Sequence, residues 1–544
     1  MRAIRAREKG SVSAATPAAA WPSLLLLTLA FWLRVHNLAT QSFWYDEVAT
    51  WLRANSNLQL MYASLLEARN QVPLYYLLMR PWALIGASEF VLRFASVLWG
   101  VLSVALIYAF GRRYLGRLAG LTAAFLLALS AVHVWYSQEA RMYALLVLCA
   151  LAAGWFLLRW IESRQRRHWL GYTAAMAVAV LVHYFGLLLL LAHYIFMAWH
   201  FRRQQLALGR WLLSVGIVVA LLALYVAPGL AAGAGKLPAP AWVRPVNWRD
   251  PWLTLLSLSA GRTINPESAL PYLAPGLFLA FMGAALLARP PLSAEGKLQA
   301  KAKQLAPRLL LIWLVVPWLL ALTISLPWPI PGRPALSVYA DRYLILVLPA
   351  LLLLVAKGAQ AVLRTRPLRP AAGLALALIA ALNLAAIVNL YLADEHGRED
   401  WRSALAYVQQ NGAEDSALIG RPDHRLPATF YAPSVPFIGL PPAPVEAELQ
   451  DEFEAEVAAR LAQAAEDHSR LWLINHAYNN DIHGFGVGRE AQLAASLATD
   501  PALAWMNARY QAAERRTYPG IVLTAYDVSG RVADQVGVLP EAAK

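Results

Sequence analysis

Apolar runs close to 20 residues long recur along this chain, and they set the limits on what it can fold into. A helix needs about 20 apolar residues to cross the hydrocarbon layer of a bilayer. Composition agrees, because 15% of the residues are charged whereas soluble domains carry about 25%. The chain is therefore predicted to be mainly α-helical and to cross a membrane many times. The expected spans are 18–36, 88–110, 118–136, 141–160, 168–183, 184–200, 211–231, 271–289, 308–328, 342–363 and 371–393.

The number of spans depends on residues 168–200, which are too many for one span and few for two. His183-Tyr184-Phe185-Gly186 offers a turn inside this stretch. With two spans there and the N-terminus inside, each inward loop has at least three basic residues and the long outward loops have few. Because Lys and Arg are retained on the cytoplasmic side, this pattern favours about eleven spans and an extracytoplasmic C-terminus.

Charge also divides the chain along its length. The chain has a net charge of +14, but residues 394–544 contain 12 basic and 22 acidic residues. The positive charges before residue 394 stand in short clusters between apolar runs, which is typical of cytoplasmic loops and not of a nucleic-acid interface. Nucleic acid is therefore not an expected partner. The predicted parts are a cytoplasmic N-terminus (1–17), a membrane domain (18–393) and an extracytoplasmic soluble domain (394–544).

The acidic tail has the pattern of a small α/β domain. Trp401, Leu405 and Val408 recur at helical spacing, and Gly412 stands where the helix would stop. Short β-rich runs alternate with further helical stretches. The expected strands are Leu471–Ile474 and Gly520–Tyr526, and the expected helices are 446–464 and 489–498.

Acidic residues are scarce before position 394, so their positions are informative. Asp46 and Glu47 follow the first span directly after Ser42-Phe43-Trp44-Tyr45. A carboxylate held beside apolar rings has a raised pKa, which suits a general base that takes a proton from a hydroxyl or amine. A solvated pair of loop carboxylates is the alternative.

Two further acid and base pairs are expected on the outward side. Glu139 and Arg141 share a connection of only a few residues, so both must face the same outer cavity or form an interfacial ion pair. Glu89 and Arg93 lie four residues apart at the outer end of the second span. This spacing predicts an ion pair along the helix.

Arg342 stands at the outer start of the tenth span. Its planar guanidinium can hold a phosphate, or it can serve as a snorkelling anchor beside Tyr343. His183 and His133 lie near the outer surface and can join the carboxylates in a metal site, although lone histidines are more often interfacial. No phosphate-binding loop, CxxC pair or HExxH motif occurs.

Six short segments occur in a fixed order along the chain: the acidic pair, 71–78, 86–93, 136–143, 183–186 and 341–343. Together they resemble the bacterial membrane glycosyltransferases of the protein-mannosyltransferase type (family 39, GT-C fold). The aminoarabinose and galacturonic acid transferases that act on lipopolysaccharide belong to the same group. The resemblance covers about residues 20–395. One departure is Gln71-Val72-Pro73, where many relatives have two prolines.

The resemblance implies a GT-C-like helical bundle in a bacterial inner membrane. It implies transfer of a sugar from a polyprenyl-phosphate donor to a lipid, glycan or protein acceptor on the non-cytoplasmic face. The cofactor stays open, because some relatives engage a divalent cation and others do not show that need.

The resemblance also implies roles for particular residues. Asp46 would deprotonate the acceptor, Glu139 would be a second active-site acid, and Glu47 would orient Asp46 or hold a cation. Arg141 or Arg342 would stabilise the departing lipid phosphate. The residues expected to surround these groups are Glu89, Arg93, Tyr143 and His183, and the candidate metal ligands are Asp46, Glu139 and His183.

Other classes of membrane protein fit the sequence less well. A transporter or lipid flippase would be expected to show an internal repeat and polar groups near the middle of its spans, and neither is evident. An O-antigen polymerase or ligase would be expected to depend on arginines and a histidine in a late outer loop. A non-catalytic scaffold for envelope assembly is the remaining alternative.

Overall fold

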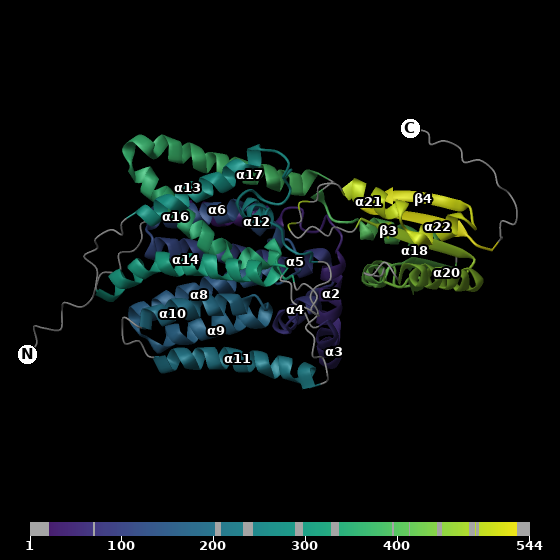
Figure 1. Ribbon diagram of the computed structural model, residues 1–544, viewed down its shortest axis with the longest axis horizontal. Coiled ribbons are helices and arrows are strands. Elements are labelled where there is room, and N and C mark those ends of the chain that lie inside the picture. Colours follow the sequence, from purple (N-terminus) through teal and green to yellow (C-terminus); the bar gives the residue numbers. More distant parts are fainter. Residues whose placement is uncertain are drawn as a thin grey trace, which may run out of the picture.

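The computed structural model describes residues 21–68, 71–201, 208–231, 243–288, 297–327, 337–393, 396–412, 414–442, 449–477, 483, 485 and 489–529. The predicted N-terminal segment 1–17 and the first residues of the predicted helix 446–464 lie outside this set. A bundle of long helices forms one end of the molecule and a sheet with its own helices forms the other (Figure 1).

The bundle consists of helices whose lengths follow the apolar runs. They are α1 (Trp21–Val35), α5 (Glu89–Tyr114), α6 (Arg117–Leu129), α7 (Ala131–Ser137), α8 (Tyr143–Ser163), α9 (Arg166–Val182), α10 (Gly186–Phe201), α11 (Leu208–Ala231), α13 (Leu273–Leu287), α14 (Lys297–Ser325), α15 (Asp341–Leu344), α16 (Leu348–Arg364) and α17 (Arg369–Leu392). Every predicted span therefore overlaps a helix.

Fewer of the described bundle helices are long enough to cross a membrane than the sequence predicts. Within the described residues, seven helical segments are long and apolar enough to cross a membrane, or eight if the bent pair α6 and α7 is one span. Helices α1 and α10 are apolar but shorter, and α9 has 17 residues. The predicted count of eleven stays a prediction, whereas the prediction of a polytopic helical bundle is confirmed.

The bend between α6 and α7 measures 60° and exposes carbonyl groups that an unbroken helix would satisfy. Arg34 of α1, which is fully buried, donates to the carbonyl oxygens of Leu127 (3.0 Å) and Ala128 (3.1 Å). Asn383 of α17 accepts from the amide of Ala131 at 3.0 Å. Because an unpaired peptide group is costly in an apolar medium, these two side chains stabilise the bend.

Four short helices lie in the predicted outward loops: α2 (Tyr45–Asn55), α3 (Leu58–Ala68), α4 (Leu74–Ile85) and α12 (Asp250–Ala260). Helices α2, α3 and α4 stand at the end of the bundle that faces the sheet (Figure 1). Asp46 and Glu47, expected in a loop, lie in the first turn of α2. Carboxylates are favoured there because the helix dipole is positive at its N-terminus.

The C-terminal module is an α/β sheet with helices on both faces. Its strands are β1 (Ser416–Gly420), β2 (Phe437–Gly439), β3 (Arg470–His476), β4 (Ala512–Tyr518) and β5 (Ile521–Asp527), in the order β2-β1-β3-β5-β4. Strand β1 is parallel to β2 and β3, while β5 is antiparallel to β3 and β4. All five residues of β1 are buried, as expected for a central strand covered on both faces.

Helices α18 (Trp401–Asn411) and α19 (Arg425–Tyr431) cover one face of the sheet, and α20 (Gln450–Asp467) and α22 (Pro501–Asn507) cover the other. The module also contains α21 (Arg489–Ala498). The predicted helices and strands of the tail are therefore confirmed in type, and Gly412 does follow the last residue of α18.

The module is joined to the bundle by side chains of α19 and the outer helices. The ring of Phe430 lies 5.4 Å from that of Phe43 and 4.8 Å from that of Trp51. Tyr431 accepts from the amide of Phe43 at 2.6 Å through its hydroxyl. The segment that carries Asp46 and Glu47 is thus held between the bundle and the module.

Candidate functional site

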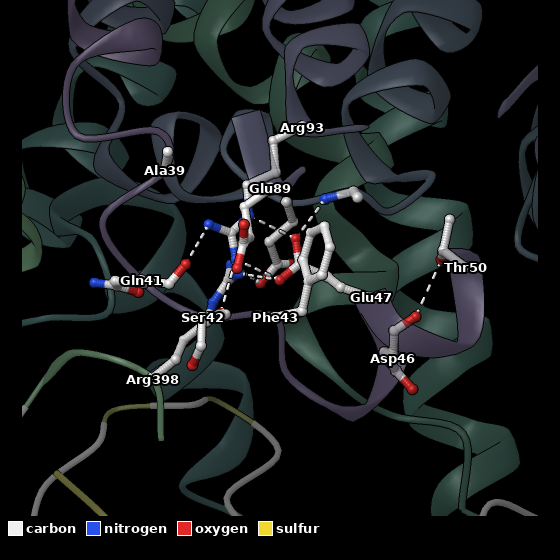
Figure 2. Close-up of polar contacts among 12 residues, drawn as sticks. Ala39, Gln41, Ser42, Phe43, Asp46, Glu47, Thr50, Glu89, Arg93 and Arg398 are labelled. Carbon is white, nitrogen blue, oxygen red and sulfur yellow. Dashed lines mark hydrogen bonds and ion pairs between the residues drawn. The ribbon is translucent and has the colours of Figure 1, made fainter. Parts of the chain in front are cut away.

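Asp46 and Glu47 point to different surroundings although they are neighbours in sequence. Successive residues of an α-helix project about 100° apart, so the two side chains cannot share one environment. The carboxylate of Asp46 is 22% exposed, whereas that of Glu47 is fully buried. Figure 2 shows Glu47 among arginine side chains and Asp46 apart from them.

A small cavity at the end of the bundle that faces the C-terminal module (Figure 1) brings Asp46 together with most of the predicted phosphate-binding and surrounding residues. Its lining includes Asp46, Arg141, Tyr143, His183 and Arg342. These residues come from α2, from the connection between α7 and α8, from the first residue of α8, from the turn before α10 and from α15. The cavity therefore has one carboxylate and two guanidinium groups in its wall, together with aromatic rings.

Arg141 is the link between Asp46 and the rest of the cavity. Its Nη2 lies 3.4 Å from Oδ2 of Asp46, and its Nη1 donates to the backbone carbonyl of Asp46 at 3.2 Å. The same Nη1 donates to the hydroxyl of Tyr76 at 3.4 Å. Arg141 is only 4% exposed. Its buried guanidinium therefore holds both the first turn of α2 and the carboxylate of Asp46 in place.

His183 ends α9 and turns its ring towards the tyrosines of the cavity. Its Nδ1 accepts from the amide of Phe185 at 3.1 Å, and its ring lies 5.0 Å from that of Tyr343. The imidazole therefore acts as a hydrogen-bond acceptor at Nδ1.

Glu47 is the centre of a buried ion cluster beside the cavity (Figure 2). Arg93 donates to it twice, from Nε at 2.8 Å and from Nη2 at 2.7 Å, and Arg398 forms a second ion pair with it. The amide of Ala140 donates at 2.7 Å. Burial acts to raise the pKa of Glu47, but Arg398 and Arg93 outweigh it and hold the pKa below its ordinary value. Glu47 therefore does not have the raised pKa expected of a general base.

The predicted pair of Glu89 with Arg93 along one helix is wrong. Arg93 turns inward to Glu47, and Glu89 pairs instead with Arg402 of α18 at 2.6 Å and accepts from the hydroxyl of Tyr431 at 2.7 Å. The helical spacing allows a contact between Glu89 and Arg93. However, burying the charge of Glu47 without a cation would cost more free energy than such a surface ion pair contributes.

Glu139 is buried behind the cavity and does not line it. Its Oε1 accepts from the indole of Trp135 at 2.8 Å and pairs with Nη2 of Arg398 at 3.0 Å. Its Oε2 is buried and has no hydrogen-bond partner among the described residues. Burial raises the pKa of Glu139 above its ordinary value and the charge of Glu47 adds to this, although Arg398 opposes both.

Arg398 is the residue that sequence reasoning missed. It lies in Gly397-Arg398-Glu399-Asp400, after the last span and within the acidic tail. The partners of Arg398 lie 351 and more than 250 residues earlier in the chain. The local sequence therefore looks like a solvated linker and does not reveal that Arg398 is paired. A single basic residue among acidic ones directly after a span was the available signal.

The predicted metal ligands do not converge. Among the described parts of the chain, one group of three metal-binding side chains lies close together, and it consists of Asp423, His424 and His476 of the module. Asp46 and His183 share a cavity, but Glu139 does not line it. His133 is also remote from it, since its Nδ1 contacts Arg34 at 2.8 Å beneath the α6–α7 bend.

Known proteins share this architecture. Residues 70–228 match the family model of the dolichyl-phosphate-mannose-protein mannosyltransferases. No curated protein matches the chain at a significant level in a sequence search.

Solved structures extend the likeness to most of the chain. The apo structure of ArnT from Cupriavidus metallidurans is 14% identical, with 93% of this chain and 98% of that chain covered and a TM-score of 0.56. The structure of the same protein bound to undecaprenyl phosphate is 16% identical, with the same coverage and a TM-score of 0.55. The apo oligosaccharyltransferase of Archaeoglobus fulgidus is 14% identical, with 95% and 74% covered and a TM-score of 0.50.

At these identities the structural matches establish the fold, and the family match adds the class of enzyme. The alternative membrane-protein classes gain no support from either comparison. The chain is a membrane glycosyltransferase with the GT-C fold, and residues 70–228 match the model of the dolichyl-phosphate-mannose-protein mannosyltransferase family.

Proposed function

We propose that this protein transfers a sugar from a polyprenyl-phosphate donor to an acceptor at the extracytoplasmic face of a bacterial inner membrane, with Asp46 as the base. The single observation that carries the proposal is the cavity in which Asp46 faces Arg141 and Arg342. An accessible carboxylate opposite two guanidinium groups suits a reaction in which a hydroxyl or amine loses a proton while a phosphate gains charge.

The donor phosphate is assigned to Arg141 and Arg342. Guanidinium groups match phosphate oxygens through paired N–H donors, and both arginines line the cavity at the outer end of the bundle. A relative of the same fold, ArnT from Cupriavidus metallidurans, has been solved with undecaprenyl phosphate bound. The lipid chain would lie along the apolar surface of the bundle, with its phosphate in the cavity.

The transfer is a single displacement. The oxygen or nitrogen of the acceptor attacks the anomeric carbon, and the bond from that carbon to the phosphate oxygen breaks. The proton of the acceptor passes to the carboxylate of Asp46, and the bonding electrons leave with the lipid phosphate, where the arginines stabilise them. Attack opposite to the leaving group inverts the anomeric carbon.

Space in the cavity limits how the donor enters. The cavity has a volume of about 50 Å³, and small-molecule sites usually have about 300 Å³ or more. Side chains of the wall therefore have to turn aside to admit a sugar phosphate. Tyr143 and Tyr343 are among the lining residues, and their rings offer an apolar face against which a sugar can stack.

Glu47 and Glu139 are proposed to position the base and not to exchange protons with substrate. Glu47 anchors the first turn of α2 through Arg93 and Arg398, and Asp46 is the preceding residue of that turn. Glu139 holds Arg398 in place from the other side. A divalent cation at Asp46 is not required by this scheme, because Arg141 already supplies the neighbouring positive charge.

The decisive experiment compares Asp46→Asn with Glu267→Gln. Both remove an outward carboxylate, but Glu267 is exposed and outside the cavity. Transfer is measured from a panel of undecaprenyl-phosphate-linked sugars to lipid, glycan and peptide acceptors. We expect Asp46→Asn to lower kcat by about 10²- to 10⁴-fold with an unchanged melting temperature, and Glu267→Gln to leave kcat unchanged. Full turnover in Asp46→Asn would rule out Asp46 as the base.

A further inference from the structure

The C-terminal module places several polar side chains at one edge of its sheet. Strands β2 and β3 lie on opposite sides of β1 and both run parallel to it. In such sheets ligands bind at the carboxyl ends of the strands, at the point where the connections leave in opposite directions. Here that point lies between the end of β1 at Gly420 and the end of β3 at His476.

Two histidines and an aspartate meet at this edge. Nε2 of His424 lies 2.6 Å from Nδ1 of His476 and 4.0 Å from Oδ1 of Asp423. Nε2 of His476 lies 3.7 Å from Oδ2 of Asp423. One atom from each of the three residues can be chosen so that all lie within 4.8 Å of one another.

The histidines are built into the module and are not surface side chains. His424 is 1% exposed and His476 is 7% exposed. The ring of Trp401 lies 5.3 Å from that of His424 and 5.5 Å from that of His476. A methyl group at Gly420 would come within 2.4 Å of Nδ1 of His424, so the glycine makes room for this ring.

The ring of His424 turns Nε2 towards the other two side chains of the cluster. Its Nδ1 lies on the side of Gly420 and has no hydrogen-bond partner among the described residues. The two imidazoles therefore meet through nitrogen atoms, which are the atoms that ligate metals.

We propose that Asp423, His424 and His476 bind one divalent transition-metal ion, with Zn²⁺ as the best match. Imidazole nitrogens and a carboxylate oxygen are typical zinc ligands, and three protein ligands leave a fourth position for water or another ligand. To reach the distances of a tetrahedral site, the two ring nitrogens that lie 2.6 Å apart have to separate and the carboxylate of Asp423 has to approach them.

The positive charge of Arg421 disfavours a metal ion at this cluster. Its Nη2 lies 3.2 Å from Nδ1 of His476 and 3.1 Å from Oδ2 of Asp423. The side chain of Arg421 is 36% exposed, so it can turn towards solvent when the ion enters. Replacing Arg421 with glutamine is therefore expected to strengthen metal binding.

The proposed site is next to the helix that carries Asp46, although it does not depend on the chemistry of Asp46. The amide of Trp401 donates to Oγ of Ser42 at 3.2 Å. The edge of the module that holds the proposed site is therefore in contact with the segment that leads into α2.

The test uses the full chain in detergent, stripped with a chelator and then equilibrated with Zn²⁺. We expect about one tightly bound zinc per chain by elemental mass spectrometry. His476→Gln and Asp423→Asn are each expected to weaken binding at least tenfold, and Arg421→Gln to strengthen it. The matched control is His468→Gln, a histidine of the same module that pairs with Asp415 and should have no effect.

A second measurement separates loss of metal binding from loss of folding. Asp423 is one-third exposed, so Asp423→Asn is expected to keep the melting temperature of the metal-free chain. Co²⁺ should give visible absorption bands typical of tetrahedral nitrogen and oxygen ligation in the unaltered chain. Absence of zinc binding, equal binding in His476→Gln, or binding of inorganic phosphate at Arg421 in place of zinc would each overturn the proposal.

Discussion

Arg398 and Glu139 form a buried ion pair, with 3.0 Å between Nη2 and Oε1, that joins the start of the C-terminal module to the connection between α7 and α8. The same guanidinium pairs with Glu47. One side chain therefore neutralises two carboxylates that lie on different outward segments of the chain.

Arg398→Gln is expected to be strongly destabilising. Removing one partner of a buried ion pair costs about 3–5 kcal/mol, because the remaining charge stays buried. Arg402→Gln is the matched control, since Arg402 also pairs with an outward glutamate but is 40% exposed, and such pairs contribute up to about 1 kcal/mol. Thermal unfolding in detergent should show a clearly larger loss for Arg398→Gln. Equal losses would mean that the cluster around Glu47 does not stabilise the fold.

Arg342→Ala is expected to weaken binding of undecaprenyl phosphate. Hydrogen bonds to charged groups contribute about 1.5–3 kcal/mol, which corresponds to a loss of roughly 10- to 100-fold in affinity. Arg249→Ala serves as the control, because Arg249 is an exposed arginine of the outer segment. Affinity is measured by competition against a labelled lipid phosphate. If both variants bind like the unaltered chain, Arg342 is an anchor and not a phosphate ligand.

The proposed topology can be tested with single cysteines. Cys149 is the only cysteine of the chain and is buried, so the natural chain should not react with a membrane-impermeant maleimide. Gln409→Cys, exposed on α18, should be labelled without opening the inner membrane. Arg166→Cys, exposed at the start of α9, should be labelled only after it is opened. The reverse pattern would contradict the predicted orientation.

The helices of the bundle could be predicted from the sequence because each membrane span requires a continuous apolar segment. Each predicted span overlaps a helix of the structure. The residues of the cavity could also be found, because Asp46, Arg141, His183 and Arg342 each adjoin the outer end of a span.

The pairing of these residues could not be read in the same way. Glu89 and Arg93 have an ideal local spacing, but each is bound to a partner elsewhere in the chain. Glu47 and Asp46 look equivalent in sequence, and only the direction of α2 separates an exposed carboxylate from a buried one. The histidine cluster escaped notice because Asp423 and His476 are brought together by the order of the strands.

Arg398 has a consequence for how the protein matures. It is 351 residues away from Glu47, so Glu47 is synthesised long before its second cation, and the bundle before the tail. Until Arg398 is synthesised and docked, the helix that carries Asp46 lacks one of the two arginines that anchor Glu47. If Asp46 is the base as proposed, a chain truncated before residue 398 should insert into the membrane but lose sugar transfer.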